Sequence, residues 1–401
     1  MVNVNPLKRA FTVFKDESKL DINYVPPRLP HRDKELNFLK QLFKFAIERP
    51  GYMTQRVLIT GKIGTGKTVL SQRFGIDICA EAEKRKINLK YIHVNCRECK
   101  GSLFLILSKV MGSLHPNFPK RGFSAEELLE MLLEALDSEN VYLILTLDEL
   151  ESLIWKEGSD PIYNLTRVQE SRLGKPQRLS LICILRDEFV LAKLDASTRS
   201  TLQRNIIRLK EYSKEQLFDI LADRVELAFK KGAVPQETLD FIAELSAMEG
   251  GDARYAIELL WRAGKYADLH SSPQVLPEHV REAAVRIYPT VRKDALANLS
   301  LHEKLLLLAV ARIFKNCDEA SVSMGDLELE YAVVCEEFGE KPRGHTQIWK
   351  YVKSLSRLGV IKAFVSLAGT KGRTTMISLH KIPASELEKE ILSILGVKIE
   401  N

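Results

Sequence analysis

The sequence predicts a chain of three parts: an α/β domain built on a parallel sheet, an all-helical segment, and a C-terminal domain of helices closed by a β-hairpin. Three observations support this. In the first half, short apolar runs alternate with amphipathic helical patterns, as in a parallel sheet that is covered by helices on both faces. Strand-like runs stop near Ser213, and four helical patterns follow. Two strand-like runs around a glycine-containing loop return near the C-terminus and predict a hairpin.

Composition is that of an ordinary globular protein. The chain has 401 residues, of which 45% are apolar, and a net charge of +6 that permits an anionic partner. The longest apolar run, Leu305 to Ala311, is too short to span a membrane, so we expect a cytoplasmic protein. Six cysteines are scattered along the chain, as expected of reduced thiols. The pair Cys96 and Cys99 has no second pair to complete a zinc site, so we interpret its spacing as coincidence.

The first domain is expected over residues 16–212, after a flexible arm of residues 1–15. Prolines in the segment from Tyr24 to Pro30 predict an extended lead-in, and Asp33 to Glu48 has helical apolar spacing. The expected strands are Val57–Thr60, Leu89–Asn95, Val141–Leu147, Leu179–Leu185 and, more weakly, Ile206–Leu209. The expected helices between them include Val69–Lys86, Ser124–Leu136 and Ile162–Arg172.

A phosphate-binding loop follows the first strand. The motif G-x-x-x-x-G-K-[ST] is complete and consists of Gly61, Lys62, Ile63, Gly64, Thr65, Gly66, Lys67 and Thr68. Its glycines let backbone N–H groups turn toward phosphate oxygens, and the following helix adds the positive end of its dipole. We expect Lys67 to reach the β- and γ-phosphates and Thr68 to bind Mg²⁺. The sequence therefore predicts an ATP or ADP site.

Two acids end the third expected strand. Asp148 and Glu149 follow the apolar run Val141 to Leu147. They therefore lie at the end of a buried strand, at the edge of the sheet where the phosphate loop begins. We assign Asp148 to the metal ion and Glu149 to the polarisation of a water molecule.

The all-helical segment is expected over residues 213–290. Its four patterns are Lys214–Lys231, Pro235–Ser246, Asp252–Ala267 and Pro277–Tyr288. The third begins with Gly250-Gly251-Asp252-Ala253-Arg254, where Asp252 can cap the helix and Arg254 can reach a γ-phosphate from the first turn.

The third domain, expected over residues 291–401, has a sharp division of charge. Residues 318–340 contain eight acids and no Lys or Arg, whereas residues 341–380 contain only bases among the charged types Asp, Glu, Lys and Arg. These bases are Lys341, Arg343, Lys350, Lys353, Arg357, Lys362, Lys371 and Arg373. A concentrated basic segment is the footprint expected of phosphate contact.

Helical geometry divides the segment from Thr346 to Leu358 into two faces. Ile348, Val352 and Leu355 share one face. The opposite face holds Thr346, Gln347, Lys350, Lys353, Ser354 and Arg357, the types of side chain that contact phosphates and base edges. A hairpin with a basic tip follows, and helices followed by a hairpin constitute a winged helix. We assign DNA binding to this face together with Arg343, Lys371 and Arg373. A winged helix that contacts protein instead is the alternative.

The order of motifs resembles the AAA+ class of P-loop ATPases, in which a helical lid carries a second sensor arginine. The resemblance implies that role for Arg254, and it implies that the lead-in from Pro26 to Leu36 packs around the adenine. We therefore add Val25, Arg32 and Tyr212 to the nucleotide-binding candidates.

Two positions depart from the AAA+ pattern. The strand Leu179–Leu185 ends in Arg186, where the first sensor is usually an asparagine that positions water. The arginine finger is either Arg199 or Arg204, or neither of them. These departures predict at most a slow ATPase, with ATP acting mainly as a conformational switch.

An AAA+ domain, lid and winged helix in this order resemble the archaeal replication initiators, which are relatives of the origin recognition complex and its helicase-loading partner. The resemblance implies binding of double-stranded origin DNA, switching between ATP and ADP, recruitment of the replicative helicase, and possible pairing with paralogous initiators. It also implies a DNA-contacting helical insertion, for which Ser102 to Phe123 is the expected place, with Lys109, Lys120 and Arg121. A motor or clamp-loader ATPase and a negative regulator at origins or promoters are the alternatives.

Overall fold

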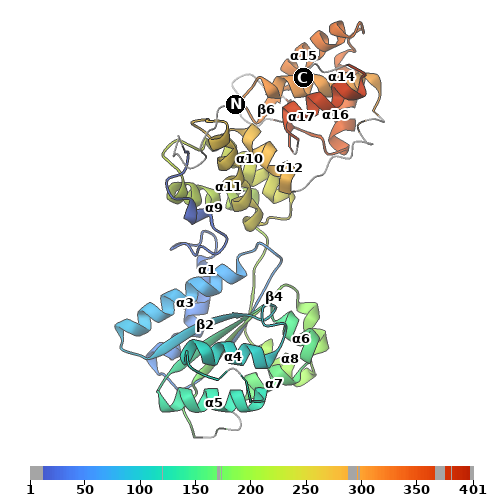
Figure 1. The fold of residues 1–401 in the computed structure, drawn as a ribbon. Coiled ribbons are helices and arrows are strands. Elements are labelled where there is room, and N and C mark those ends of the chain that lie inside the picture. Colours follow the sequence, from blue (N-terminus) through green and yellow to red (C-terminus); the bar gives the residue numbers. More distant parts are fainter. Residues whose placement is uncertain are drawn as a thin grey trace. The chain divides into compact units, whose positions relative to one another are not determined.

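The computed structural model describes residues 12–119, 121–168, 172, 174–287, 296, 299–365, 375–380 and 382–397 (Figure 1). The chain forms two compact units. The sheet unit comprises Val25–Gln216 and Gly250–Ala253, and the lid–wing unit comprises Met1–Tyr24, Leu217–Glu249 and Arg254–Asn401.

The sheet unit is built on five parallel strands. They are β1 (Arg56–Thr60), β2 (Leu89–Asn95), β3 (Tyr142–Asp148), β4 (Leu179–Leu185) and β5 (Ile206–Arg208), in the order β2-β3-β4-β1-β5. Parallel strands that are buried on both faces read as continuous apolar runs, which is why the sequence located β1, β3 and β4 to within one residue.

Helices cover both faces of this sheet (Figure 1). On one face, Ile144 and Ile182 pack with α1 (Asp33–Leu42), α2 (Lys44–Glu48) and α3 (Lys67–Lys84). On the other, Leu145 and Cys183 pack with the helices that follow β2 and β3. These are α4 (Leu103–Leu114), α5 (Ala125–Ser138), α6 (Glu151–Glu157) and α7 (Asp160–Arg167). A 3₁₀ helix, η2 (Glu188–Lys193), and α8 (Ala196–Leu202) connect β4 to β5.

The helix expected from Asp33 to Glu48 is interrupted. Phe43 lies between α1 and α2, is fully buried, and has its ring centroid 5.0 Å from that of Phe74 on α3. The apolar spacing was correct, but burial of this ring accompanies a break in the helix that the spacing did not indicate.

The lid portion of the lid–wing unit is helical, as predicted. It contains α9 (Lys214–Ala228), α10 (Gln236–Met248), α11 (Ala253–Leu269) and α12 (Pro277–Ile287), and η1 (Glu17–Leu20) precedes the sheet unit. Residues 12–15, which the sequence analysis assigned to the arm, pack against the lid. The Thr12 hydroxyl donates to Asp268 at 2.7 Å, and the buried Phe14 ring contacts Phe229. A Cβ at Gly264 would come within 2.4 Å of the Phe14 ring, so the small residue makes room for it.

The C-terminal portion is a winged helix. It contains α14 (Leu301–Lys315), β6 (Ser321–Ser323), α15 (Met324–Glu337), α16 (His345–Arg357), β7 (Ile361–Val365), β8 (Thr375–Leu379) and α17 (Ala384–Ile394). The three strands form an antiparallel sheet in the order β6-β8-β7. The predicted fold class, a parallel-sheet domain with a helical lid and a C-terminal winged helix, is confirmed.

Candidate functional site

The phosphate loop joins β1 to α3. Gly64 and Gly66 have positive φ angles of 75° and 89°, and Gly66 is the N-cap of α3. Lys67, the first residue of α3, donates from Nζ to the carbonyls of Gly61 and Lys62 at 2.5 and 2.6 Å. The loop thus has the left-handed turns that only glycine adopts readily, with a lysine ammonium folded over them.

Other segments of the sheet unit hold the loop. Arg32 is buried, and its guanidinium donates to the Thr65 carbonyl at 2.9 Å and to the Lys210 carbonyl at 2.7 Å. The same guanidinium stacks on the Tyr212 ring, 4.1 Å from its centroid. A Cβ at Gly66 would lie 2.8 Å from the Tyr212 hydroxyl. Arg32 and Tyr212 therefore lie beside the loop, and Arg32 is engaged by backbone carbonyls there.

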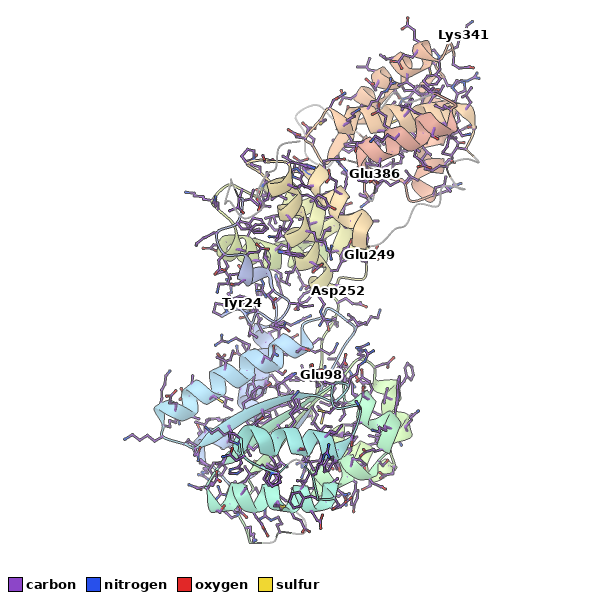
Figure 2. The ribbon with its side chains drawn as sticks, viewed as in Figure 1. Tyr24, Glu98, Glu249, Asp252, Lys341 and Glu386 are labelled. Carbon is purple, nitrogen blue, oxygen red and sulfur yellow. The ribbon has the colours of Figure 1, made fainter. Side chains whose placement is uncertain are left out.

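The Gly-Gly turn before α11 also contacts the loop. The Ala253 N–H donates to the Gly64 carbonyl at 3.2 Å, and a Cβ at Gly64 would overlap the Asp252 carboxylate. Figure 2 labels Glu249 and Asp252 on either side of this turn. Arg254 is the second residue of α11 and belongs to the lid–wing unit, so its reach toward a γ-phosphate stays a prediction. Val25 is half-buried at the start of the sheet unit.

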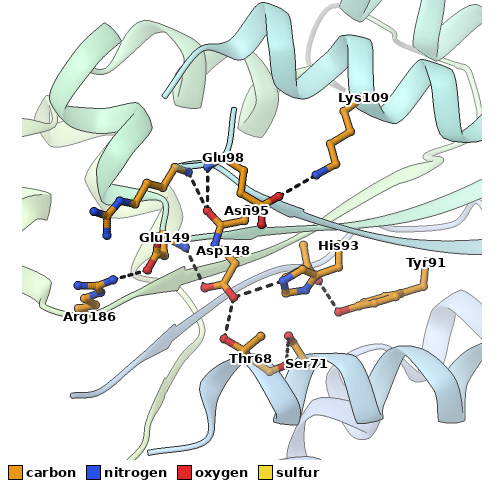
Figure 3. Close-up of polar contacts among 12 residues, drawn as sticks. Thr68, Ser71, Tyr91, His93, Asn95, Glu98, Lys109, Asp148, Glu149 and Arg186 are labelled. Carbon is orange, nitrogen blue, oxygen red and sulfur yellow. Dashed lines mark hydrogen bonds and ion pairs between the residues drawn. The ribbon is translucent and has the colours of Figure 1, made fainter. Parts of the chain in front are cut away.

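Asp148 is buried at the end of β3 and accepts three hydrogen bonds (Figure 3). The Thr68 hydroxyl donates to Oδ2 at 2.7 Å, and His93 Nε2 lies 3.3 Å from the same oxygen. The Glu149 N–H donates to Oδ1 at 2.8 Å. Burial raises the pKa of a carboxyl group, but the bonds from His93 and Thr68 outweigh this, so the pKa of Asp148 lies below its ordinary value. The group is therefore an anion at neutral pH.

Glu149 does not have a free carboxylate. Its backbone has a φ of +51°, and its side chain forms an ion pair with Arg186, which follows β4. Arg186 Nε also lies 3.4 Å from Glu151. Desolvation raises the pKa of Glu151, and its Oε2 is buried without a hydrogen-bond partner in the described part of the chain. The structure thus brings Asp148, Glu149 and Arg186 together, with Arg186 bound to the carboxylates.

Two residues of this cluster were missed by the sequence analysis. Tyr91 and His93 lie on the face of β2 that carries Asn95, next to the polar face of β3. The Tyr91 hydroxyl accepts a bond from Thr146 at 3.0 Å, and burial raises the pKa of Tyr91 to about 12. The sequence did hold a signal, because polar side chains at every second position of a parallel strand, Tyr91, His93 and Asn95, break the apolar run expected there.

The two arginine-finger candidates lie on and just after α8 of the sheet unit. Arg199 is half-buried on α8, and Arg204 is exposed after that helix. Among the contacts between described residues, none joins either arginine to the phosphate loop or to Asp148. The finger assignment stays a prediction.

The basic helix of the winged helix is α16. Ile348, Val352 and Leu355 are buried in the domain core, as the helical pattern predicted. On the other side, Thr346, Lys350, Lys353 and Arg357 are exposed, and Gln347 and Ser354 are half-buried. Lys341, labelled in Figure 2, precedes this helix.

Other DNA-binding candidates have different surroundings. Arg343 donates from Nε to His302 Nε2 at 3.0 Å, so one N–H of its guanidinium is already hydrogen-bonded within the domain. Arg121 is exposed before α5, and Lys109 on α4 pairs with Glu98 at 3.1 Å. Lys120, Lys371 and Arg373 lie outside the described residues.

Comparison with known proteins identifies the family. Residues 218–285 match a Cdc6 AAA+ ATPase-type lid domain, and residues 294–389 match the C-terminal winged helix domain of CDC6. An ORC1-type DNA replication protein 2 from Sulfurisphaera tokodaii is 36% identical over 385 residues, which cover 94% of this chain and 92% of that protein. The chain belongs to the ORC1/Cdc6 family of DNA replication proteins. The family resemblance stated from the sequence is thereby confirmed.

Solved structures of ORC1/Cdc6 proteins share the fold. Cdc6p from Pyrobaculum aerophilum matches with a TM-score of 0.82 and 31% identity, over 96% of this chain and 99% of that one. The Aeropyrum pernix ORC1 protein in complex with DNA matches at 0.63 and 28%, over 95% and 97%. The A. pernix ORC2 protein, in ADPNP–ADP complexes, matches at 0.64 and 26%, over 96% and 98%.

The described part of this ORC1/Cdc6 chain offers no membrane span, because each helix there is too short or too polar for one.

Proposed function

We propose that this ORC1/Cdc6 protein is a nucleotide-switched replication initiator, which binds ATP or ADP around Lys67 and double-stranded origin DNA through α16 and its hairpin. The observation that carries the proposal is the joint presence of a phosphate loop with its acidic partner and an exposed basic helix face in one chain. Relatives support both halves, because one was solved with DNA and another with ADPNP and ADP. We extend the proposal to recruitment of the replicative helicase, as the family resemblance implies.

The phosphate loop is suited to a nucleoside di- or triphosphate. Its N–H groups and the α3 dipole favour anionic oxygens, and Lys67 can exchange two carbonyl acceptors for phosphate oxygens. The Thr68 hydroxyl and the ionised Asp148 supply the oxygen ligands that Mg²⁺ prefers, so the residues fit that ion. Bound there, Mg²⁺ would neutralise charge on the β- and γ-phosphates.

The environment of Glu149 favours a switch over a fast motor. A general base for hydrolysis must be within hydrogen-bond reach of the attacking water. Here the Glu149 carboxylate is paired with Arg186, and Arg186 itself cannot accept a proton from water. A long-lived ATP state follows from this arrangement, and it is the state a switch needs.

A network of charged residues joins the lid to the winged helix, which supports communication between the two sites. Arg281 on α12 is fully buried and donates to the carbonyls of Leu379 at 2.8 Å and Ala320 at 3.3 Å. Glu237 on α10 accepts from the Ala320 N–H at 2.6 Å, and Glu278 accepts from the Ala384 N–H at 2.8 Å. We propose that lid movements driven by nucleotide are passed to the winged helix through this network.

The Lys67→Ala variant tests the proposal. Removing the ammonium should abolish ATP and ADP binding, while α16 keeps part of the DNA affinity. Fluorescent-nucleotide binding and duplex binding at low salt, each measured with ATP, with ADP and without nucleotide, give the readouts. Footprinting on genomic DNA of the source organism identifies the site. Wild-type protein that ignores duplex DNA at low salt, or binds it equally well in all three nucleotide conditions, contradicts the proposal.

A further inference from the structure

We propose that His93 is a positioning residue of the divalent-cation site, which fixes the Asp148 carboxylate in the orientation that cation binding requires. The inference rests on the proposed nucleotide site and assigns a role there to a residue outside the phosphate-loop and acidic motifs. Figure 3 shows His93 and Thr68 directed at the same oxygen of Asp148.

The Asp148 carboxylate is held by groups on three segments. Thr68 on α3 and His93 on β2 both contact Oδ2, at 2.7 and 3.3 Å, and the Glu149 N–H contacts Oδ1 at 2.8 Å. A cation bound to the Thr68 hydroxyl oxygen would weaken the hydrogen bond from Thr68 to Asp148. His93 is then the remaining side-chain donor to Oδ2 among the described residues, and it keeps the carboxylate from rotating.

The register of β2 against β3 places His93 on the same face as Asp148. Asn95 pairs with Asp148, and His93 pairs with Thr146, so these four side chains share one face of the β2–β3 pair. Among the described residues, the Asn95 side chain forms hydrogen bonds through Oδ1, which accepts the N–H groups of Arg97 and Glu98 at 2.9 and 3.2 Å, and none joins it to Asp148. His93 is therefore the side chain of β2 that contacts the carboxylate.

The ligand preference of the cation favours positioning over direct ligation. Mg²⁺ takes oxygen ligands, whereas imidazole suits transition metals. The buried His93 Nδ1 has no hydrogen-bond partner among the described residues, whereas Nε2 faces a carboxylate. This geometry is that of an Nε2–H donor to Asp148 with a bare Nδ1. His93 therefore acts on the cation through Asp148.

The test is the dependence of nucleotide binding on Mg²⁺. Fluorescent ADP is bound to the full-length protein while free Mg²⁺ is titrated from a chelated baseline, and the Mg²⁺ concentration at half-saturation is measured. Loss of a residue that orients a metal ligand typically weakens metal affinity by about 10–100-fold. His93→Leu should raise the half-saturating concentration by about that factor, with ADP affinity in chelator unchanged. His93→Gln, whose amide can still donate, should recover most of the loss.

Lys90→Ala is the matched control, because it removes an exposed side chain from the same strand. It should leave the Mg²⁺ dependence unchanged. Equal loss of ADP affinity with and without Mg²⁺ in His93→Leu would overturn the inference in favour of a merely structural role. The inference would also be overturned if ADP binding by His93→Leu depended on Mg²⁺ as it does in the wild-type protein. If wild-type protein binds no ADP, or binds it without regard to Mg²⁺, the proposed nucleotide site fails instead.

Discussion

At the scale of single residues, the proposed use of ATP as a switch depends on the ion pair between Arg186 and Glu149. Arg186 stands where a water-positioning amide is usual in AAA+ proteins, and it occupies the carboxylate that would act as base. A positioned general base contributes about 10²–10⁴-fold to rate. We expect Arg186→Asn to release Glu149 and raise the single-turnover rate of ATP hydrolysis at least about tenfold. Phosphate release under saturating Mg²⁺ and ATP measures it.

The double variant Arg186→Asn with Glu149→Gln controls for this effect. If the released carboxylate is the cause, the second change removes the gain. An Arg186→Asn rate at or below that of wild type, with ATP affinity preserved, would show that Arg186 assists hydrolysis rather than restraining it. In either case Lys193→Ala, a change of an exposed residue at the end of η2, should leave the rate unchanged.

At the scale of elements, the exposed face of α16 should bear the electrostatic part of DNA binding. Lys350 and Arg357 are both exposed there, and each phosphate contact releases a counterion. Replacing either by alanine should weaken binding to all duplexes and reduce the slope of log affinity against log salt by about one. Lys389→Ala on α17 removes an exposed charge of the same domain and serves as the control. Unchanged slopes in both α16 variants would remove this helix from the interface.

The elements also show what local sequence can specify. β1, β3 and β4 were located because burial on both faces produces an apolar run, and α16 because its period separates Ile348 from Lys350. β6 was missed, since three residues show no period and its partner β8 lies more than fifty residues away. The phosphate loop and Asp148 are visible as motifs. The contacts of Arg32, His93 and Arg281 are not, because each joins segments that only the tertiary fold brings together.

At the scale of the whole molecule, the proposed switch requires that the winged helix move with the lid. Arg281 is central to that link, since it is buried and its guanidinium lies near the rings of Phe241 on the lid and Phe314 on the winged helix, at 5.3 and 4.6 Å from their centroids. Its partner Glu278, 3.0 Å away, is partly exposed and can be rehydrated. Arg281→Met keeps the length and the ring contacts but loses the bonds to Leu379 and Ala320.

We expect Arg281→Met to bind ATP, ADP and DNA separately, yet to lose the coupling between them. Coupling is a ratio of affinities, and it vanishes when the ligand no longer distinguishes the states of the second site. The ratio of duplex affinities with ATP and with ADP should therefore fall to about one. Arg262→Met is the control, because it breaks a half-buried pair with Glu258 and a contact with the Trp261 ring, both within α11. Thermal unfolding checks that the winged helix stays folded, since the carbonyls of Leu379 and Ala320 lose a buried donor, at a cost of about 1–3 kcal/mol for each unsatisfied group. A folded Arg281→Met protein with the wild-type ratio would mean that bound nucleotide changes the DNA affinity by a route other than this network.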